Sequence, residues 1–440
     1  MLHQNSYCSK FRPFLSLVFL LSFSSCGVNL SDFNFSSKPG KKTLAPAELG
    51  NSKTYEAKKL SDGPETSLSP EAKVQKGVTP LLLSEELSFS PHTGAITGII
   101  PYGDDSVISG GNDGQVILSR LTPDRTKFVT EKLLVGTKPI LAMSLSDDKN
   151  LLAISQTSLV SVYDLKERKI VYELSRVRGR IIALSWDPRS ELVSIGLAGG
   201  DIYIWSLKQS FFGGQGRDSF DSLEHYIGAS TPIIGLHFLP SGGAFLSVEL
   251  EGGLNVWRAL RTEEELGLRD KFNLEDQEAI SSVMVNFAVL PTFATDSALT
   301  SDGNYFLASS ADGKLNSWKI RGLVRQVEST VSKESLLSIT EVGFGDKKLR
   351  SYQFLLTSTQ DQKIQILCQK RSSNQSSTAL EYLLLAETPP MSSTLSRVRS
   401  ALSGNLVWAS EKSDKIIAIS GAELSEQLRV NPRLENCSSN

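Results

Sequence analysis

The chain has 440 residues, of which 40% are hydrophobic and 21% are charged, so it can bury a sizeable apolar core. Its formal net charge of −2 gives no indication of a nucleic-acid partner. The four cysteines, at positions 8, 26, 368 and 437, form no CxxC pair, which excludes a zinc ribbon and provides no disulfide framework.

The first 25 residues have the composition of an export signal. Lys10 and Arg12 precede the apolar run of residues 14–23, FLSLVFLLSF. Ten helical residues span only about 15 Å, half of a bilayer core of about 30 Å. This run is too short to cross a membrane, and we predict a secretory signal peptide over residues 1–25.

The end of this segment, Ser24-Ser25-Cys26, resembles the lipobox of bacterial lipoproteins, in which small residues precede an invariant cysteine. The resemblance implies that the Cys26 thiol is acylated, that the chain is cut before it, and that the lipid anchors the protein to a membrane of the cell envelope. The box departs from the usual leucine at Phe23. Two alternatives remain: cleavage by an ordinary signal peptidase, which Phe23 disfavours, and an incidental cysteine. Gly27 is not the aspartate that retains lipoproteins at the inner membrane in some bacteria, which favours the outer membrane, with the domain in the periplasm or at the cell surface.

Residues 26–78 are predicted to be a lipidated N-terminus followed by a disordered linker. The stretch is rich in Ser, Lys, Pro, Gly and Glu and poor in large apolar residues, so it cannot bury enough surface to offset the entropy of ordering. About 50 flexible residues have a reach of roughly 40 Å. The linker would therefore hold the folded domain at a distance from the membrane.

Residues 79–424 repeat one pattern: an apolar strand, a turn, a second apolar strand, a Gly- or Asp-containing turn, and a third strand that ends in an aromatic residue. Short alternating strands with regular turns indicate an antiparallel all-β fold. The units begin every roughly 40–60 residues, a spacing typical of propeller blades with insertions. The seven units cover residues 95–121, 139–165, 181–207, 233–260, 297–320, 336–369 and 394–420.

One unit carries the turn Asp-Gly at residues 312–313 followed five residues later by tryptophan, and other units have an aromatic residue at the same position. These positions resemble the WD40-repeat family over about 340 residues. The resemblance implies a seven-bladed β-propeller, with six or eight blades as alternatives because insertions blur the count. It also implies a structural role within the blades for Asp312 and the matching aromatic residues, which are Tyr163, Trp205, Trp257 and Trp318.

In the WD40 family a hydrogen-bonded His–Ser–Asp–Trp set braces each blade. No unit of this chain retains the complete set, and His92 is the nearest counterpart of the family's Gly-His pair. Further turn acids stand at matching positions as Asp113, Glu251 and Asp361.

The propeller must close into a ring, because an open one would leave two exposed sheet edges. Residues 79–88, TPLLLSEELS, precede the first unit and are predicted to be a lone strand. In the family such a strand completes the last blade. We therefore expect it to pair with the blade that contains residues 405–420.

Two long interruptions, residues 208–230 and 261–292, are the main departures from the repeat. Insertions in a rigid propeller map to loops, and loops carry binding more often than strands do. The first contains two adjacent aromatic residues and the second an acidic run. They are either interaction loops or solvated decoration without a binding role. The candidate interaction residues are Phe211, Phe212, Glu263, Glu264 and Glu265.

The sequence contains no GxSxG elbow, no HExxH and no P-loop. His225 and His237 are twelve residues apart without a flanking ligand pattern, so no metal site is predicted from them. From the residues around each, His237 is expected in an apolar strand and His225 in a loop. No catalytic, cofactor-binding or metal-binding residue is predicted, and the protein is not expected to be an enzyme. Arg397 and Arg399 alternate along an expected strand and are candidates for the wall of the central channel.

The C-terminal residues 425–440 are predicted to be a frayed tail. Cys368 ends an expected strand and Cys437 lies in this tail. A disulfide between them is one alternative in an oxidising envelope. A buried single cysteine with a loose tail is the other, and the polar sequence of the tail favours it.

These features together favour a membrane-anchored scaffold or adaptor that binds other proteins through the propeller faces and long loops, without nucleic acid. The alternative is a propeller that binds a small ligand or carbohydrate in its central channel; a propeller enzyme has less support. A channel lined by converging Asp, Arg or Trp side chains would favour a ligand or enzyme, and a smooth channel with an apolar rim would favour the scaffold. Fold alone does not decide between them.

Overall fold

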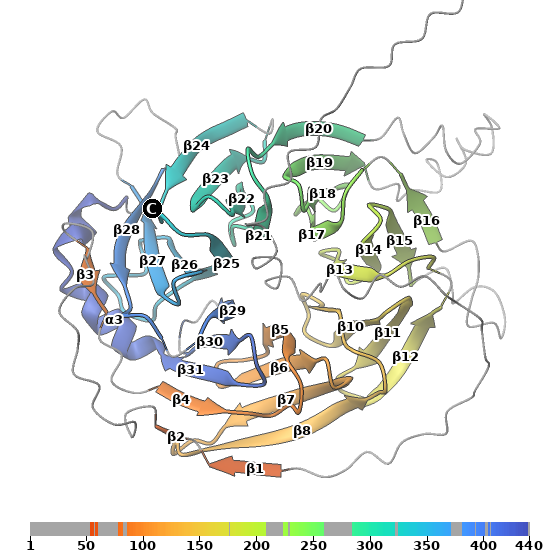
Figure 1. Ribbon diagram of the computed structural model, residues 1–440, viewed down its shortest axis with the longest axis horizontal. Helices are drawn as coiled ribbons and strands as arrows, with labels where there is room; N and C mark the ends of the chain where they lie inside the picture. Colours follow the sequence, from red (N-terminus) through yellow and green to blue (C-terminus); the bar gives the residue numbers. More distant parts are fainter. Residues whose placement is uncertain are drawn as a thin grey trace, which may run out of the picture.

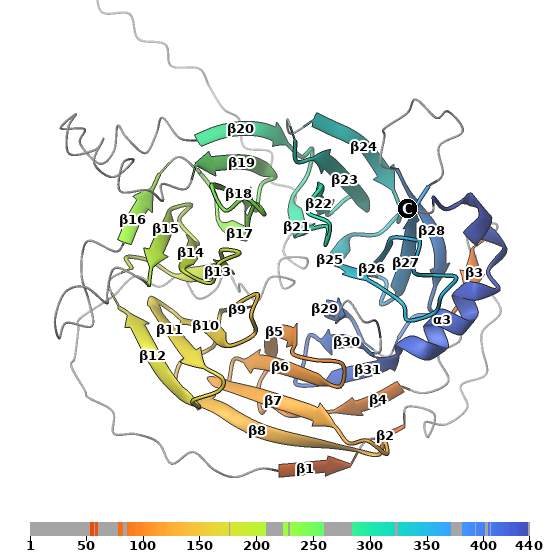
Figure 2. The same cartoon turned by 180° about the vertical axis from the view of Figure 1, so that it is seen from behind.

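The computed structural model shows seven β-sheets arranged as blades around a central axis (Figures 1 and 2). The structure describes residues 53–56, 58–59, 78–81, 86–175, 177–207, 223–227, 229–258, 284–321, 324–370, 381–391, 393–400, 404 and 406–438. Neighbouring strands within a blade are antiparallel, and each blade runs from an inner strand at the axis to an outer strand at the rim. The predicted all-β, seven-bladed propeller is confirmed.

The first four blades follow chain order, each from inner to outer strand. Blade 1 contains β5 (Ile96–Pro101), β6 (Ser106–Gly111), β7 (Gln115–Leu121) and β8 (Lys127–Val135). Blade 2 contains β9 (Ala142–Leu145), β10 (Leu151–Gln156), β11 (Leu159–Asp164) and β12 (Lys169–Leu174). Blade 3 contains β13 (Ile181–Trp186), β14 (Leu192–Leu197), β15 (Ile202–Ser206) and β16 (Leu223–Tyr226). Blade 4 contains β17 (Ile233–Phe238), β18 (Ala244–Glu249), β19 (Gly253–Arg258) and β20 (Met284–Val289).

The remaining three blades complete the ring. Blade 5 contains β21 (Ala294–Leu299), β22 (Tyr305–Ser310), β23 (Lys314–Lys319) and β24 (Val324–Thr330). Blade 6 contains β25 (Leu336–Val342), β26 (Phe354–Thr359), β27 (Ile364–Gln369) and β28 (Tyr382–Glu387). Blade 7 contains β29 (Leu395–Ser400), β30 (Leu406–Glu411), β31 (Ile416–Ser420) and, as its outer strand, β4 (Glu86–Phe89) from the start of the domain.

The core lies between neighbouring blades rather than at the axis. Ile202 and Ile204 of blade 3 belong to one buried cluster with Phe245 and Trp257 of blade 4. The middle strands of each blade are therefore covered on both faces, which explains why they are buried at nearly every position instead of alternating between buried and exposed residues. All six residues of β26, for example, are buried.

The ring closes as the sequence predicts. β4 pairs antiparallel with β31, and Phe89 lies opposite Ile416. The expected lone strand is nevertheless divided, because β3 (Thr79–Pro80) pairs parallel with β28 of blade 6 instead. Closure within one blade by strands from both ends of the domain leaves no open sheet at the junction.

Two short segments of the predicted disordered linker form strands, which corrects the expectation for those residues. β1 (Lys53–Glu56) pairs with the outer edge of β8 in blade 1. β2 (Lys58–Lys59) pairs with β4 in blade 7. Blades 1 and 7 thus gain a fifth strand at the rim, as blade 6 does from β3. The backbone N–H and C=O groups of these strands pair with an edge that would otherwise face solvent.

The predicted frayed tail is wrong. Residues 421–429 form helix α3 (Gly421–Arg429), capped by the Ser420 side chain, and a short 3₁₀ helix η7 (Pro432–Asn436) follows. Cys437 then forms a disulfide with Cys368 at the end of β27, so the less favoured alternative for these two cysteines is the observed one. The prediction rested on the polar residues of this segment, but its apolar residues decide its structure. Leu424, Leu428 and Leu434 are buried in one cluster with the core of blades 6 and 7.

Strand alternation fixes which loops share a face. Since successive strands are antiparallel, the connections from first to second strand and from third to fourth strand emerge on one face, which we call the long-loop face. The other connections emerge on the opposite face, which we call the short-turn face. The two predicted interruptions are third-to-fourth connections in blades 3 and 4, although each is shorter than expected because β16 and β20 lie within them. None of the helices among the described residues is both long and apolar enough to span a membrane.

Candidate functional site

The central channel is lined by the inner strands of the blades and contains a cavity of about 220 Å³. In six of the seven inner strands the pairing shifts at a β-bulge close to the start of the strand. A bulge re-aims the residues beside it. The cavity is walled by residues next to the bulges of β5, β13, β17, β21 and β29, and by residues of β9 and the position before it.

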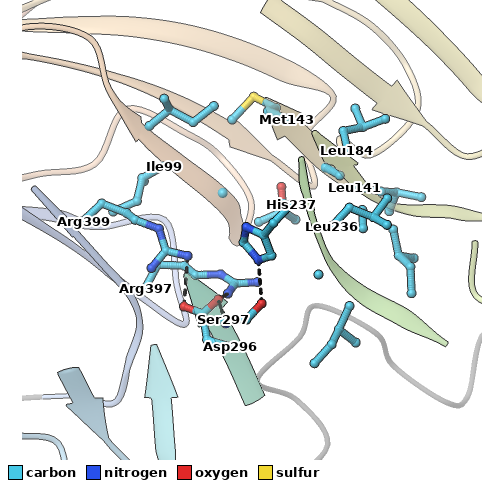
Figure 3. Close-up of a pocket in the computed structure, with 18 residues that line it drawn as sticks. Ile99, Leu141, Met143, Leu184, Leu236, His237, Asp296, Ser297, Arg397 and Arg399 are labelled. Carbon is cyan, nitrogen blue, oxygen red and sulfur yellow. Dashed lines mark hydrogen bonds and ion pairs between the residues drawn. The ribbon is translucent and has the colours of Figure 1, made fainter. Parts of the chain in front are cut away.

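One wall of the cavity is charged (Figure 3). Asp296 on β21 of blade 5 lies 3.0 Å from Arg399 and 3.6 Å from Arg397, both on β29 of blade 7. The Asp296 carboxylate also accepts hydrogen bonds from Ser338 Oγ (3.2 Å) and the Ile339 N–H (2.9 Å) on β25 of blade 6. This single carboxylate therefore links three consecutive blades at the axis.

Asp296 remains ionised in this setting. Burial raises the pKa of its carboxyl group, but attraction to the Arg399 and Arg397 guanidinium groups outweighs burial and holds the pKa below its ordinary value. The two arginines and one aspartate leave one net positive charge on the wall of the cavity.

His237 on β17 lies beside this cluster. Its Nε2 is 2.8 Å from the Ser297 hydroxyl, and its ring contacts Phe306 edge-on at a centroid distance of 5.7 Å. Burial lowers the pKa of His237 to about 4, and the nearby Arg399 charge acts in the same direction. The ring is thus neutral near pH 7 and adds no charge to the channel. Its expected place in an apolar strand is observed, whereas His225, expected in a loop, lies in β16.

The opposite wall of the cavity is apolar. Figure 3 shows Leu184 and Leu236 on the side away from the arginines, with Met143 above His237. Gly98 and Gly235 on the inner strands keep the wall open, since they place no side chain in the channel. The cavity is therefore two-sided: guanidinium groups on one side and aliphatic side chains on the other.

A second polar network braces blade 1. His92 Nε2 lies 2.8 Å from Ser109 Oγ, and Nδ1 lies 3.0 Å from Asp113. Burial outweighs the attraction of Asp113 and lowers the pKa of His92, so the neutral ring donates from Nδ1 to the carboxylate and accepts from the serine hydroxyl at Nε2. Asp113 also accepts from the Thr93 N–H at 3.0 Å. This arrangement retains three of the four groups of the bracing set.

Blade 4 contains the complementary part of the set. Trp257 Nε1 donates to Ser247 Oγ at 2.8 Å. The acid is Glu249, which accepts from the Ser230 and Thr231 N–H groups at 3.0 and 3.1 Å. Glu251, the turn acid expected from the sequence, is exposed, because the longer side chain of Glu249 reaches the same place from two residues earlier in the chain.

The structure places the other predicted blade residues as follows. The aromatic side chains at the shared position of the third strands are all buried: Tyr163, Trp205, Trp257 and Trp318. Asp312 lies in the turn between β22 and β23, where it accepts from Ser310 Oγ at 2.6 Å and pairs with Lys314 at 3.3 Å. These residues stabilise the blades and do not line the channel cavity.

The candidate interaction residues Phe211, Phe212, Glu263, Glu264 and Glu265, and the lipidation candidate Cys26, lie outside the described residues. The strands that flank both insertions are nevertheless defined. β15 and β19 end, and β16 and β20 begin, on the long-loop face of two neighbouring blades (Figure 1). Both insertions therefore leave and re-enter the propeller on the same face.

The sequence reasoning missed Asp296 and the channel position of His237, whereas Arg397 and Arg399 line the channel as weighed. By the criterion set out above, converging Asp and Arg side chains favour a ligand or an enzyme over the scaffold. Among the residues that the structure describes, no group of three or more His, Cys, Asp or Glu side chains could hold a metal ion.

Comparison with known proteins supports the fold and gives no information about the function. No family model matches the chain, and no curated protein matches it. Of 1753 chains of known structure that match, one is described as "Structure of U3-55K". It is 12% identical, with a TM-score of 0.55, and the match covers 76% of this chain and 98% of that one. At this identity the likeness shows the propeller fold alone, a fold that serves many functions.

Proposed function

We propose that this chain is an exported bacterial lipoprotein whose WD40-type propeller is a protein-interaction scaffold in the cell envelope. The observation that carries the proposal is that the two long insertions attach to neighbouring blades on one face. Rigid blades would hold the two loops side by side, as a composite surface that neither loop forms alone.

The residues of the insertions indicate the chemistry of the partner. Phe211 and Phe212 offer aromatic side chains, which are frequent anchors at protein interfaces. Glu263, Glu264 and Glu265 give the second insertion a negative run. A complementary partner would combine an apolar pocket with basic residues around it.

Two features support export to the envelope and anchoring there. The Cys368–Cys437 disulfide is of the kind that persists in oxidising compartments, such as the bacterial periplasm or cell surface. Cys26 follows an apolar run of signal-peptide length and small residues, as in lipoproteins. Acyl chains on Cys26 would anchor the protein stably, because each buried methylene contributes about 0.8 kcal/mol.

Site-specific photocrosslinking in living cells tests the proposed face. Benzoylphenylalanine replaces Phe212 or Glu264 in the two insertions, and Glu251 or Lys138, both exposed on the short-turn face, as controls. We expect the same partner protein in adducts from positions 212 and 264 and none from positions 251 and 138. Equal adducts from both faces, or none from either insertion, would contradict the proposal.

A further inference from the structure

The two arginines of the channel are not equivalent. Arg399 Nη1 donates to Ser338 Oγ at 2.6 Å, to the Ile339 carbonyl at 3.1 Å and to the Val398 carbonyl at 2.9 Å. Its Nη2 pairs with Asp296 at 3.0 Å. Arg399 is therefore held by the fold, and its charge is balanced by Asp296.

Arg397 has fewer hydrogen-bond partners than Arg399. Its one contact among the described interactions is the 3.6 Å ion pair with Asp296, too long for a hydrogen bond. The Asp296 oxygen atoms are shared with Arg399, Ser338 and Ile339, and the Arg397 side chain is 24% exposed to the channel. A guanidinium group carries five N–H donors in a planar fork that matches a carboxylate. The guanidinium group of Arg397 thus faces the channel cavity with its charge only partly neutralised.

The rest of the cavity limits what can meet this fork. The facing wall of Met143, Leu184 and Leu236 offers no hydrogen-bond partners from its side chains. A short aliphatic body would bury its surface against this wall. The wall therefore favours an aliphatic part of a ligand on the side away from the arginines.

The size of the cavity sets the scale of the ligand. Its volume of about 220 Å³ lies below the roughly 300–1,000 Å³ of pockets for drug-sized ligands. The cavity therefore suits a small ligand, and a straight-chain carboxylate of six carbons is a suitable probe of it.

We propose that the central channel binds a small carboxylate with a short aliphatic body, with its carboxylate on Arg397 and its chain against Met143, Leu184 and Leu236. Asp296 and Arg399 remain paired with each other and position the site, and neither contacts the carboxylate of the ligand. This site is independent of the long-loop face, so either proposal can fail without the other.

Isothermal titration calorimetry on the intact chain in a neutral detergent tests the site with three probes of one length: hexanoate, 1-hexanol and hexylamine. We expect binding of hexanoate, and at least tenfold weaker binding of the alcohol and the amine. Arg397→Gln should weaken hexanoate binding at least tenfold. Arg321→Gln, which removes an exposed arginine at the end of blade 5, should leave it unchanged.

A second measurement does not depend on a stable variant. The methyl signal of Met143, which lines the cavity, should shift as hexanoate is added, while that of Met391, which does not line it, should not. Equal binding of hexanoate and hexanol, unchanged binding by Arg397→Gln, or a static Met143 signal would overturn the proposal. Binding of an acetylated peptide that ends in a leucine carboxylate, without binding of hexanoate, would also overturn it and assign the site to a protein C-terminus.

Discussion

Removal of the Cys368–Cys437 disulfide should cost a large part of the stability of the domain. The bond joins the end of β27 in blade 6 to the residue after η7, and both cysteines are buried. It holds α3 and η7 against the apolar cluster of blades 6 and 7. We therefore expect Cys437→Ser to destabilise the whole propeller through blade 6, and to release the C-terminal segment first.

The magnitude follows from the length of the closed loop. The two cysteines are 69 residues apart, and a crosslink across a loop of that length reduces the entropy of the unfolded chain by an amount that corresponds to about 4 kcal/mol at 25 °C. Stabilities of folded domains are commonly about 5–15 kcal/mol. The bond thus contributes a substantial fraction of the free energy of unfolding.

Urea unfolding followed by tryptophan fluorescence measures this contribution, with and without a phosphine reductant. The oxidised wild type should unfold at a clearly higher midpoint than the reduced wild type. Cys437→Ser should match the reduced wild type and should not respond to the reductant. Coincident curves for the oxidised and reduced wild type, or two free thiols at positions 368 and 437 in protein isolated from cells, would refute the reasoning.

Three further perturbations follow from the structure. Phe89→Ala should lower the free energy of unfolding by about 3–5 kcal/mol, because Phe89 on the closing strand stacks on Phe128 at a centroid distance of 4.0 Å. Asp296→Asn should lower it by about 3 kcal/mol, because it leaves two partly buried guanidinium groups without a counter-ion. His237→Gln should remove a pH dependence: the unfolded state binds a proton near pH 6.5 and the folded state only near the lowered pKa of about 4, so wild-type stability falls as pH decreases across this window. One pKa unit corresponds to about 1.4 kcal/mol. Because part of the ring faces the channel and is screened by solvent, we expect the total loss to be on the order of 2 kcal/mol.

Matched variants control these three predictions in denaturant unfolding. Val129→Ala truncates a partly exposed residue of β8 and should change stability by less than about 0.5 kcal/mol. Asp124→Asn in an exposed turn should leave the channel intact and unfold close to the wild type. For His237→Gln, the control is the wild type unfolded at the same pH values. If Phe89→Ala were as mild as Val129→Ala, or if His237→Gln kept the full pH dependence, the closing strand or the buried histidine would not have the roles assigned here.

The repeats were predictable because each carries local signals. The inner three strands of the blades are short, largely apolar runs separated by turns that contain Gly or Asp, except at Thr157-Ser158 between β10 and β11. These signals depend only on nearby residues. The turn at Ser146 illustrates this: its hydroxyl donates to Asp148 at 2.6 Å, and Asn150 donates to the same carboxylate at 2.8 Å. The outer strands have weaker signals. β16, for example, is only the four residues LEHY after a long insertion.

The charged wall of the channel was not predictable in full, because its parts meet only in the closed ring. Asp296 and Arg399 are far apart in sequence and come from blades 5 and 7, which are joined through blade 6. Their proximity depends on the number of blades and on the bulges that re-aim the inner strands. The edge strand β1 was not predictable for a related reason. Its residues KTYE are polar, and it is held by backbone pairing with β8, which leaves no pattern in the side chains.

The most direct test of the central claim is affinity capture from cross-linked cell envelopes, followed by mass spectrometry, for wild type and Cys26→Ala, with Cys8→Ala as a control within the predicted signal peptide. A lipid-anchored scaffold predicts that specific envelope proteins are recovered with wild type and Cys8→Ala and are lost with Cys26→Ala. It also predicts that the mature wild type begins at an acylated Cys26. Recovery of no specific protein with wild type, or of the same proteins from all three chains, would contradict the account.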